Sequence, residues 1–154
     1  EMFGVLRRGE VLVLLIDWGY RPDGIPVRLF GDWTTLPAGP AVLAAKTGVP
    51  ILPVAVRRHA DGRYVLTHDE FILVGSTEPA EVARATQALA DALQRAIAEA
   101  PEQWYSFKPM WPPTPEEAAE LAGRAAAEGR GAPRPPASTR WSRSPPRPPS
   151  SPRW

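Results

Sequence analysis

The chain has 154 residues, enough for one domain with a buried core, although more than half of its 20 prolines follow Lys108. Its formal net charge is +1; two histidines argue against a histidine-rich metal cluster, and the absence of cysteine excludes a disulfide framework and a thiolate metal site. The most apolar run, Val11 to Ile16, is far shorter than the ~20 residues of a membrane-spanning helix, so we expect a soluble or peripheral protein.

The first residues, EMFGVLRRGE, are typical of the end of a helix that runs into a turn. We therefore expect the chain to start inside an element and to lack an N-terminal portion. The run GEVLVLLID follows, bounded by glycine and closed by Asp17. This pattern predicts a strand buried on both faces, with Asp17 at its carboxyl end, where open α/β sheets bind ligands.

The next segments predict a second strand and a short helix. After a turn at residues 21–24, apolar residues alternate in IPVRLFG, which predicts a strand ending at Gly31. Further on, Pro40 suits the first turn of a helix and Gly48 suits a C-cap, so we expect a helix from about Pro40 to Thr47.

The following part of the chain predicts a hairpin and a long helix. PILPVAVRR and GRYVLTHDEFIL pair across the turn at Asp61 and Gly62. Residues 78–100 carry apolar side chains at three- and four-residue spacing, which predicts an amphipathic helix ended by Pro101. This order of elements favours an α/β domain over a sandwich or a helical bundle.

The folded part is expected to end near Trp111, followed by a short helical or flexible linker at residues 113–131. Residues 132–154 are rich in Pro, Arg and Ser and contain no acidic residue, which predicts a disordered tail. Composition leaves the role of this tail open. It is compatible with a solvated tail without a partner, with binding to anionic lipid or nucleic acid, and with docking of SPPRPPSSP into an aromatic groove.

The loop FGDWTTLPAGPA combines glycines, two threonine hydroxyls and a carboxylate just before a helix, whose first amide groups favour anions. It matches neither a dinucleotide-binding fingerprint nor a P-loop, so an ordinary structural turn stays open. His59 and His68 lie in the polar hairpin region. Only Glu70 shares a strand face with His68, and neither histidine is expected to act as a general base.

Five blocks occur in an order that resembles the lipid A lauroyl and phosphatidylinositol mannoside acyltransferase family. They are Asp17 after the apolar run, GIPVRLFG, TxxPAGPA, TGVPILPV and PEQWY, and the similarity spans residues 6–111. The resemblance implies an α/β fold with a mixed sheet and flanking helices, as in glycerolipid acyltransferases. We expect residues 1–112 to be the C-terminal half of such a domain, incomplete at its N-terminus.

The same resemblance implies a reaction and a place for it. A fatty acyl group moves from acyl-CoA or acyl-ACP to a hydroxyl of a membrane glycolipid or lysophospholipid, and a peripheral enzyme does this at the cytoplasmic face of the bacterial plasma membrane. No metal, cofactor or nucleic acid is implied. The family's general base belongs to a His-x-x-x-x-Asp/Glu pair, which this chain lacks, since Tyr64 and Leu73 stand at that spacing after His59 and His68.

The resemblance also implies site residues. Asp32 stands where relatives often have a carboxylate near the active site, so it is the candidate catalytic residue. Asp17 matches the acidic position after the family's strand, and Phe30 and Gly31 match its Phe-Phe-Gly block, with Leu29 in place of the first Phe. The candidate substrate-binding residues are Asp17, Gly31, Thr35, Gly39 and Pro40.

Near the end of the matching part, the sequence SFKPMWP departs from the basic ending of lipid A enzymes and is closer to the phosphatidylinositol mannoside enzymes. We expect Trp104 to pack, whereas membrane contact stays open for Phe107 and Trp111. The leading hypothesis is an acyltransferase that is inactive as this chain alone. The alternatives are a non-catalytic lipid- or membrane-binding remnant of the fold and a nucleotide-binding α/β domain.

Overall fold

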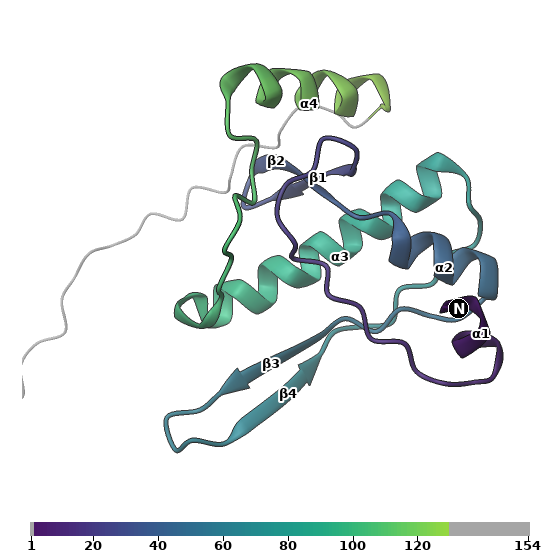
Figure 1. Cartoon of the computed structure of the whole chain (residues 1–154), viewed down its shortest axis with the longest axis vertical. Helices are drawn as coiled ribbons and strands as arrows, with labels where there is room; N and C mark the ends of the chain where they lie inside the picture. The colour runs from purple at the N-terminus through teal and green to yellow at the C-terminus, as the bar shows by residue number, and fades with distance from the viewer. Residues whose placement is uncertain (1, 130–154) are drawn as a thin grey trace, which may run out of the picture.

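The computed structural model describes residues 2–129 (Figure 1), and the tail predicted for residues 132–154 lies outside this range. The elements follow one another as α1 (Met2–Arg7), β1 (Ile25–Leu29), β2 (Asp32–Leu36), α2 (Gly39–Thr47), β3 (Val54–Arg58), β4 (Tyr64–His68), α3 (Pro79–Glu99), the 3-10 turn η1 (Pro101–Gln103) and α4 (Pro115–Ala127). The expected helix end before the first turn, the helix after Pro40, the hairpin and the long helix are thus confirmed.

Strand β2 was not expected from the sequence. It pairs antiparallel with β1, from Ile25 opposite Leu36 to Leu29 opposite Asp32. The connecting turn is Phe30-Gly31, and both residues have positive φ, 53° and 92°. Two-residue hairpin turns of this kind match the twist of the strands, and their first residue is usually Asn, Asp or Gly. Because Phe30 is unusual at this position, the sequence did not indicate a hairpin.

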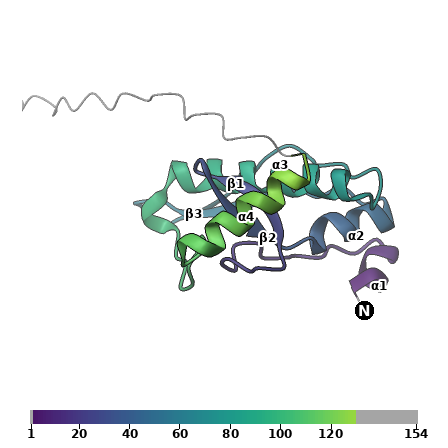
Figure 2. The same ribbon diagram turned by 90° about the horizontal axis from the view of Figure 1, so that it is seen from above.

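Helices cover both faces of the β1–β2 hairpin, as the view from above shows (Figure 2). On one face, Ala90 of α3 packs in a buried cluster with Val27 and Leu36. On the other face lies α4, whose Leu121 and Ala125 are fully buried. Packing therefore continues beyond Trp111, into the stretch at residues 113–131 for which we expected a short helical or flexible linker.

A second buried cluster joins α2 to the first turns of α3. Ala41 packs there against Val82 and Ala85, and side chains from the loop before α3 border it. Helix α2 ends at Gly48, whose φ is 70° and whose N–H donates to the carbonyl of Ala44, so the predicted glycine cap is confirmed.

The strand predicted for GEVLVLLID, residues 9–17, is wrong, because this run is irregular and largely exposed. Val11 is 86% exposed and Leu15 is 73% exposed; only Ile16 packs against the cluster around Val27. A strand buried on both faces needs neighbouring strands and covering layers. Within residues 2–129, no strand pairs with this run. Asp17 therefore does not lie at the carboxyl end of a strand.

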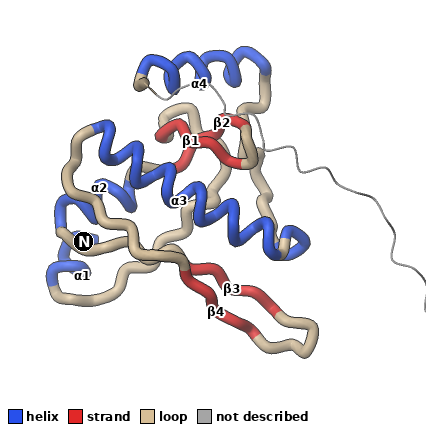
Figure 3. The backbone as a smooth tube through the Cα atoms, turned by 180° about the vertical axis from the view of Figure 1, so that it is seen from behind, coloured by secondary structure: helices blue, strands red, loops and turns tan. Residues whose placement is uncertain are grey.

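The β3–β4 hairpin extends away from the rest of the molecule (Figure 3). Its residues alternate between exposed and half-buried along both strands. The predicted α/β class with flanking helices is confirmed, and the strands form two separate two-stranded antiparallel sheets, β1–β2 and β3–β4.

Candidate functional site

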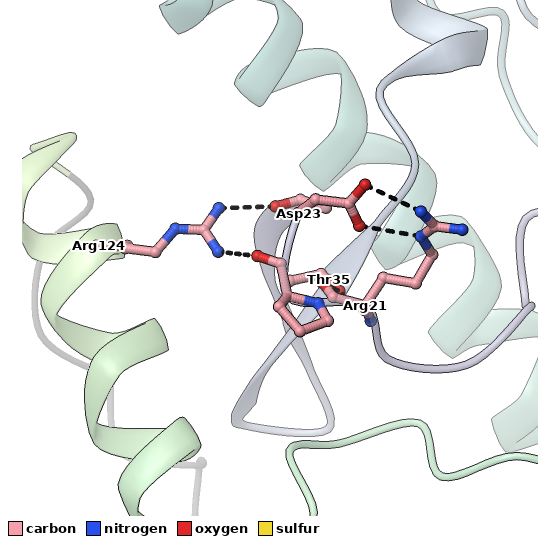
Figure 4. A network of polar contacts seen from close by, with 6 residues as sticks. Arg21, Asp23, Thr35 and Arg124 are labelled. Carbon is pink, nitrogen blue, oxygen red and sulfur yellow. Dashed lines mark hydrogen bonds and ion pairs between the residues drawn. The ribbon is translucent and has the colours of Figure 1, made fainter.

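The side chain of Thr35 stabilises the turn at residues 21–24, which precedes β1 (Figure 4). Its side chain is 1% exposed. Its hydroxyl accepts a hydrogen bond from the backbone N–H of Arg21 at 3.0 Å and donates one to the carbonyl of the same residue at 2.8 Å. A Cβ at Gly24 would lie 2.6 Å from the Cβ of Thr35, so only glycine allows this close approach.

Arg124 of α4 holds the same turn from the opposite side (Figure 4). Its guanidinium donates to the carbonyl oxygens of Pro22 and Gly24, the latter at 2.9 Å. The turn also contains the ion pair between Arg21 and Asp23, with N and O 2.9 Å apart. Arg21 lowers the pKa of Asp23 through this hydrogen bond, but both side chains are well exposed, so the pair adds little stability.

The candidate catalytic residue Asp32 lies at the other end of β2, beside the Phe30-Gly31 turn, and it is exposed. Arg28 lies on β1 opposite Trp33, one position from the residue that pairs with Asp32. The Arg28 guanidinium stacks on the ring of Trp33 at 3.9 Å and donates to the carbonyl of Gly31 at 2.8 Å. Burial lowers the pKa of Arg28, and the charge of Asp32 partly opposes this.

The structure does not gather the candidate residues at one point. Asp32 and Thr35 are three positions apart on β2, so their side chains point to opposite faces and their Cα atoms are about 10 Å apart. Gly39 and Pro40 begin α2 beyond the far end of the strand, where Gly39 is exposed and Pro40 is buried. The catalytic and substrate roles of these residues stay predictions.

Asp17 lies against the closing motif of the family resemblance. Its carboxylate accepts a hydrogen bond from the indole Nε1–H of Trp104 at 3.4 Å. Three residues further on, the N–H of Tyr20 donates to the carbonyl of Pro109 at 2.8 Å. Two motif blocks that are far apart in the sequence therefore lie side by side.

Three glutamines satisfy backbone groups of the two hairpins, and two of them, Gln87 and Gln94, belong to none of the motifs named above. Gln87 of α3 accepts from the N–H and donates to the carbonyl of Arg28. Gln103, which belongs to the closing motif, makes the same pair of bonds with Arg58 on β3. Gln94 accepts from the N–H of Phe30 at 2.5 Å. The spacing of seven residues between Gln87 and Gln94 places them on one face of α3 and is the signal that was missed.

Both histidines lie in or beside the β3–β4 hairpin and are exposed. The backbone N–H of His59 donates to the carbonyl of Arg63, and Nδ1 of His68 lies 3.1 Å from the carbonyl of Asp69. Within residues 2–129, neither histidine hydrogen-bonds to a carboxylate. The expectation that neither acts as a general base stays a prediction.

A groove of about 460 Å³ runs between α3 and the segment that follows β4. Arg84 and Arg95 line it from α3, and Phe71 and Leu73 line it from the facing segment. Arg95 is paired with the carboxylate of Asp69 at 2.6 Å, so its charge is already compensated. The groove contains none of the candidate site residues.

Glu81 forms an ion pair with Arg84, one of the residues that line this groove. It accepts from the guanidinium of Arg84 and from the N–H of Gly75 at 3.0 Å. These two hydrogen bonds lower the pKa of Glu81 from 4.5 to about 2. Arg84 also donates to the carbonyl of Leu73 at 2.6 Å, so the pair joins the loop before α3 to the first turns of the helix.

In the part of the chain that the structure describes, no three His, Asp or Glu side chains are grouped so that they could hold a metal ion. Among the helices of residues 2–129, none is long and apolar enough to cross a membrane.

Comparison with known proteins gives a family. Residues 1–112 match the family described as bacterial lipid A biosynthesis acyltransferase. The chain is 38% identical over 106 residues to a phosphatidylinositol mannoside acyltransferase of Mycolicibacterium smegmatis, and the alignment covers 69% of this chain and 34% of that protein. A protein of the same name from Mycobacterium tuberculosis is 32% identical over 106 residues, with 69% of this chain and 32% of that protein covered. The chain thus spans about a third of the length of these relatives, and it belongs to the bacterial lipid A biosynthesis acyltransferase family.

Proposed function

We propose that this chain carries the C-terminal part of an enzyme that transfers a fatty acyl group from acyl-CoA or acyl-ACP to a hydroxyl of a membrane glycolipid or lysophospholipid. The observation that supports this most strongly is the family match over residues 1–112, together with two relatives named as phosphatidylinositol mannoside acyltransferases. The departure of SFKPMWP from the basic ending expected of lipid A enzymes favours a phosphatidylinositol mannoside over lipid A as the acceptor.

In such a transfer, the acceptor hydroxyl gives its proton to a base while its oxygen attacks the thioester carbonyl, and the thiol of the donor leaves. The chain contains no His-x-x-x-x-Asp/Glu pair to act as that base. We therefore assign a supporting role to its residues. Asp32 is exposed and ready to contact an ionisable partner, and Gly31 beside it leaves its turn open on one side, since a Cβ there would meet nothing within 4 Å.

The test begins with the genomic frame upstream of the Glu1 codon. We expect it to encode a His-x-x-x-x-Asp/Glu pair. The longer protein should then transfer radiolabelled acyl groups from acyl-CoA or acyl-ACP to a lysophospholipid or a phosphatidylinositol mannoside, whereas the 154-residue chain alone should not.

Matched variants of the longer protein then test the assignment of Asp32. Asp32→Asn should lower the transfer rate, while Asp23→Asn, which changes another exposed carboxylate, should leave it within about twofold. Equal rates for both variants would contradict the role of Asp32. A start codon directly before Glu1, without an upstream frame, would contradict the enzyme and leave the second candidate function.

That second candidate is a non-catalytic lipid- or membrane-binding protein. One observation favours it: within residues 2–129, no histidine lies in hydrogen-bond contact with Asp17, Asp32 or Thr35. Vesicle binding without acyl transfer by the longest encoded protein would support it.

A further inference from the structure

Exposed aromatic side chains gather where two distant segments of the chain meet. Phe107 is 95% exposed, Tyr105 is 75% exposed and Trp18 is 64% exposed. The rings of Tyr105 and Phe107 are stacked, with centroids 6.5 Å apart, and Nζ of Lys108 lies 5.5 Å from the ring centroid of Trp18. Together, Trp18, Tyr105, Phe107 and Lys108 form what we call the aromatic patch.

The backbone beneath the aromatic patch is held in place. Gly19 has a φ of 94°, and a Cβ on it would lie 2.8 Å from the Cβ of Lys108, so the two segments touch. The hydrogen bond from Tyr20 to Pro109 ties the segments directly. The Ser106 hydroxyl donates to the carbonyl of Lys108 at 2.7 Å and closes the bend that carries Phe107. The rings are thus presented to solvent from an ordered backbone.

Trp104, next to Tyr105 in the sequence, is less exposed than the rings of the aromatic patch. Trp104 is half-buried and uses its indole N–H to bind Asp17. Met110 is almost fully buried, and its carbonyl accepts from the hydroxyl of Thr34. The segment therefore turns two of its large side chains inward and leaves Tyr105 and Phe107 outward.

We propose that the aromatic patch inserts into the headgroup region of a lipid bilayer and holds the protein at the surface that contains its acceptor. Amphipathic Trp and Tyr rings with a flanking lysine favour this region of a membrane. Three rings make a surface much smaller than the ~800 Å² per partner of a stable protein interface, which favours lipid over a second copy of the chain. The inference rests on the proposed function, because that function requires access to a membrane lipid.

Two other exposed apolar surfaces are mainly aliphatic. Val11 to Leu15 is an uninterrupted run of valine and leucine, and the outward face of the β3–β4 hairpin carries Val54, Val56 and Leu66 beside one aromatic ring, Tyr64. Such surfaces favour strand pairing. They supply the control for the experiment.

The test is co-sedimentation of the full 154-residue chain with phosphatidylcholine vesicles in high salt, which suppresses attraction by its many arginines. The variant Trp18→Ser/Tyr105→Ser/Phe107→Ser should lower the partition coefficient by at least about tenfold. The matched control Val54→Ser/Val56→Ser/Leu66→Ser removes three exposed apolar side chains from the hairpin and should change it less than about threefold. An equal loss in both variants would overturn the proposal.

A second measurement follows Trp18 itself. Lipids brominated on their acyl chains should quench part of the tryptophan fluorescence, and Trp18→Phe should remove that part while binding persists. Unchanged quenching in Trp18→Phe would overturn the insertion of this ring. Sedimentation velocity without lipid provides the last outcome: dissociation of an oligomer by the triple patch variant would identify a protein interface instead.

These readouts do not depend on acyl transfer. Loss of vesicle binding in the patch variant supports the aromatic patch even if the longer protein shows no acyl transfer and the proposed function fails. Transfer by the longer protein together with unchanged vesicle binding of the patch variant would contradict the patch alone.

Discussion

The buried hydroxyl of Thr35 provides a sharp test of the candidate site. Thr35→Val keeps the shape of the side chain but removes both hydrogen bonds to the backbone of Arg21, at 3.0 and 2.8 Å. An unsatisfied buried polar group costs about 1–3 kcal/mol. Because the Arg21 residue is exposed and water can reach part of its backbone, we expect Thr35→Val to lower the free energy of unfolding by about 1–2 kcal/mol.

The matched control is Thr35→Ser, which keeps the hydroxyl and removes one methyl group. It should lower the free energy of unfolding by about 1 kcal/mol or less. Equilibrium unfolding in urea, followed by circular dichroism, measures both variants. A Thr35→Val chain that is as stable as the parent would refute the structural role of the hydroxyl and would leave it free to contact a substrate.

Three further predictions concern the packing, the charges and the exposed run. Leu121→Ala should lower the free energy of unfolding by about 2–4 kcal/mol, since Leu121 is 1% exposed; an unchanged urea midpoint would show that α4 does not belong to the folded unit. The pKa of Glu81 is lowered to about 2, so its contribution to stability is complete above pH 4.5 and is lost as the pH falls towards 2. Glu81→Gln should therefore reduce the dependence of the free energy of unfolding on pH over this range. An unchanged slope would contradict the pairing with Arg84. We expect the chain to be aggregation-prone, and Val13→Lys in the exposed run should reduce light scattering as the protein is concentrated. Equal scattering by variant and parent would show that another surface causes the self-association.

The sequence predicted those elements whose signals are local. The amphipathic spacing in α3, the proline and glycine at the two ends of α2 and the alternation in β3 and β4 each depend on neighbouring residues alone. The run at residues 11–16 failed because a fully apolar segment says nothing about the strands that would have to lie beside it. Strand β2 was missed because Thr34 and Thr35 are both buried, so its polar residues do not alternate with apolar ones.

The candidate site was predicted less well than the fold, because its contacts join distant parts of the chain. FGDWTTLPAGPA was chosen for its glycines, hydroxyls and carboxylate, yet β2 separates Asp32 from Gly39 and directs the Thr35 hydroxyl to the backbone of Arg21. Only tertiary structure shows that a hydroxyl is already used. The proximity of Asp17 and Trp104, 87 positions apart, was likewise not readable from spacing.

Glutamine side chains satisfy backbone groups on the outer edges of the two small sheets, where a larger sheet would have further strands. A two-stranded sheet leaves unpaired N–H and C=O groups on both outer edges, and such edges favour pairing with other chains. Gln87 supplies the donor and the acceptor that a neighbouring strand would offer to Arg28 on β1, and Gln103 does the same for Arg58 on β3. Because Gln103 lies in the closing motif PEQWY, that motif has a structural use in addition to its contact with Asp17: it occupies the outer edge of β3 at the far end of the strand. A further strand that pairs with β3 is therefore excluded from the position of Arg58.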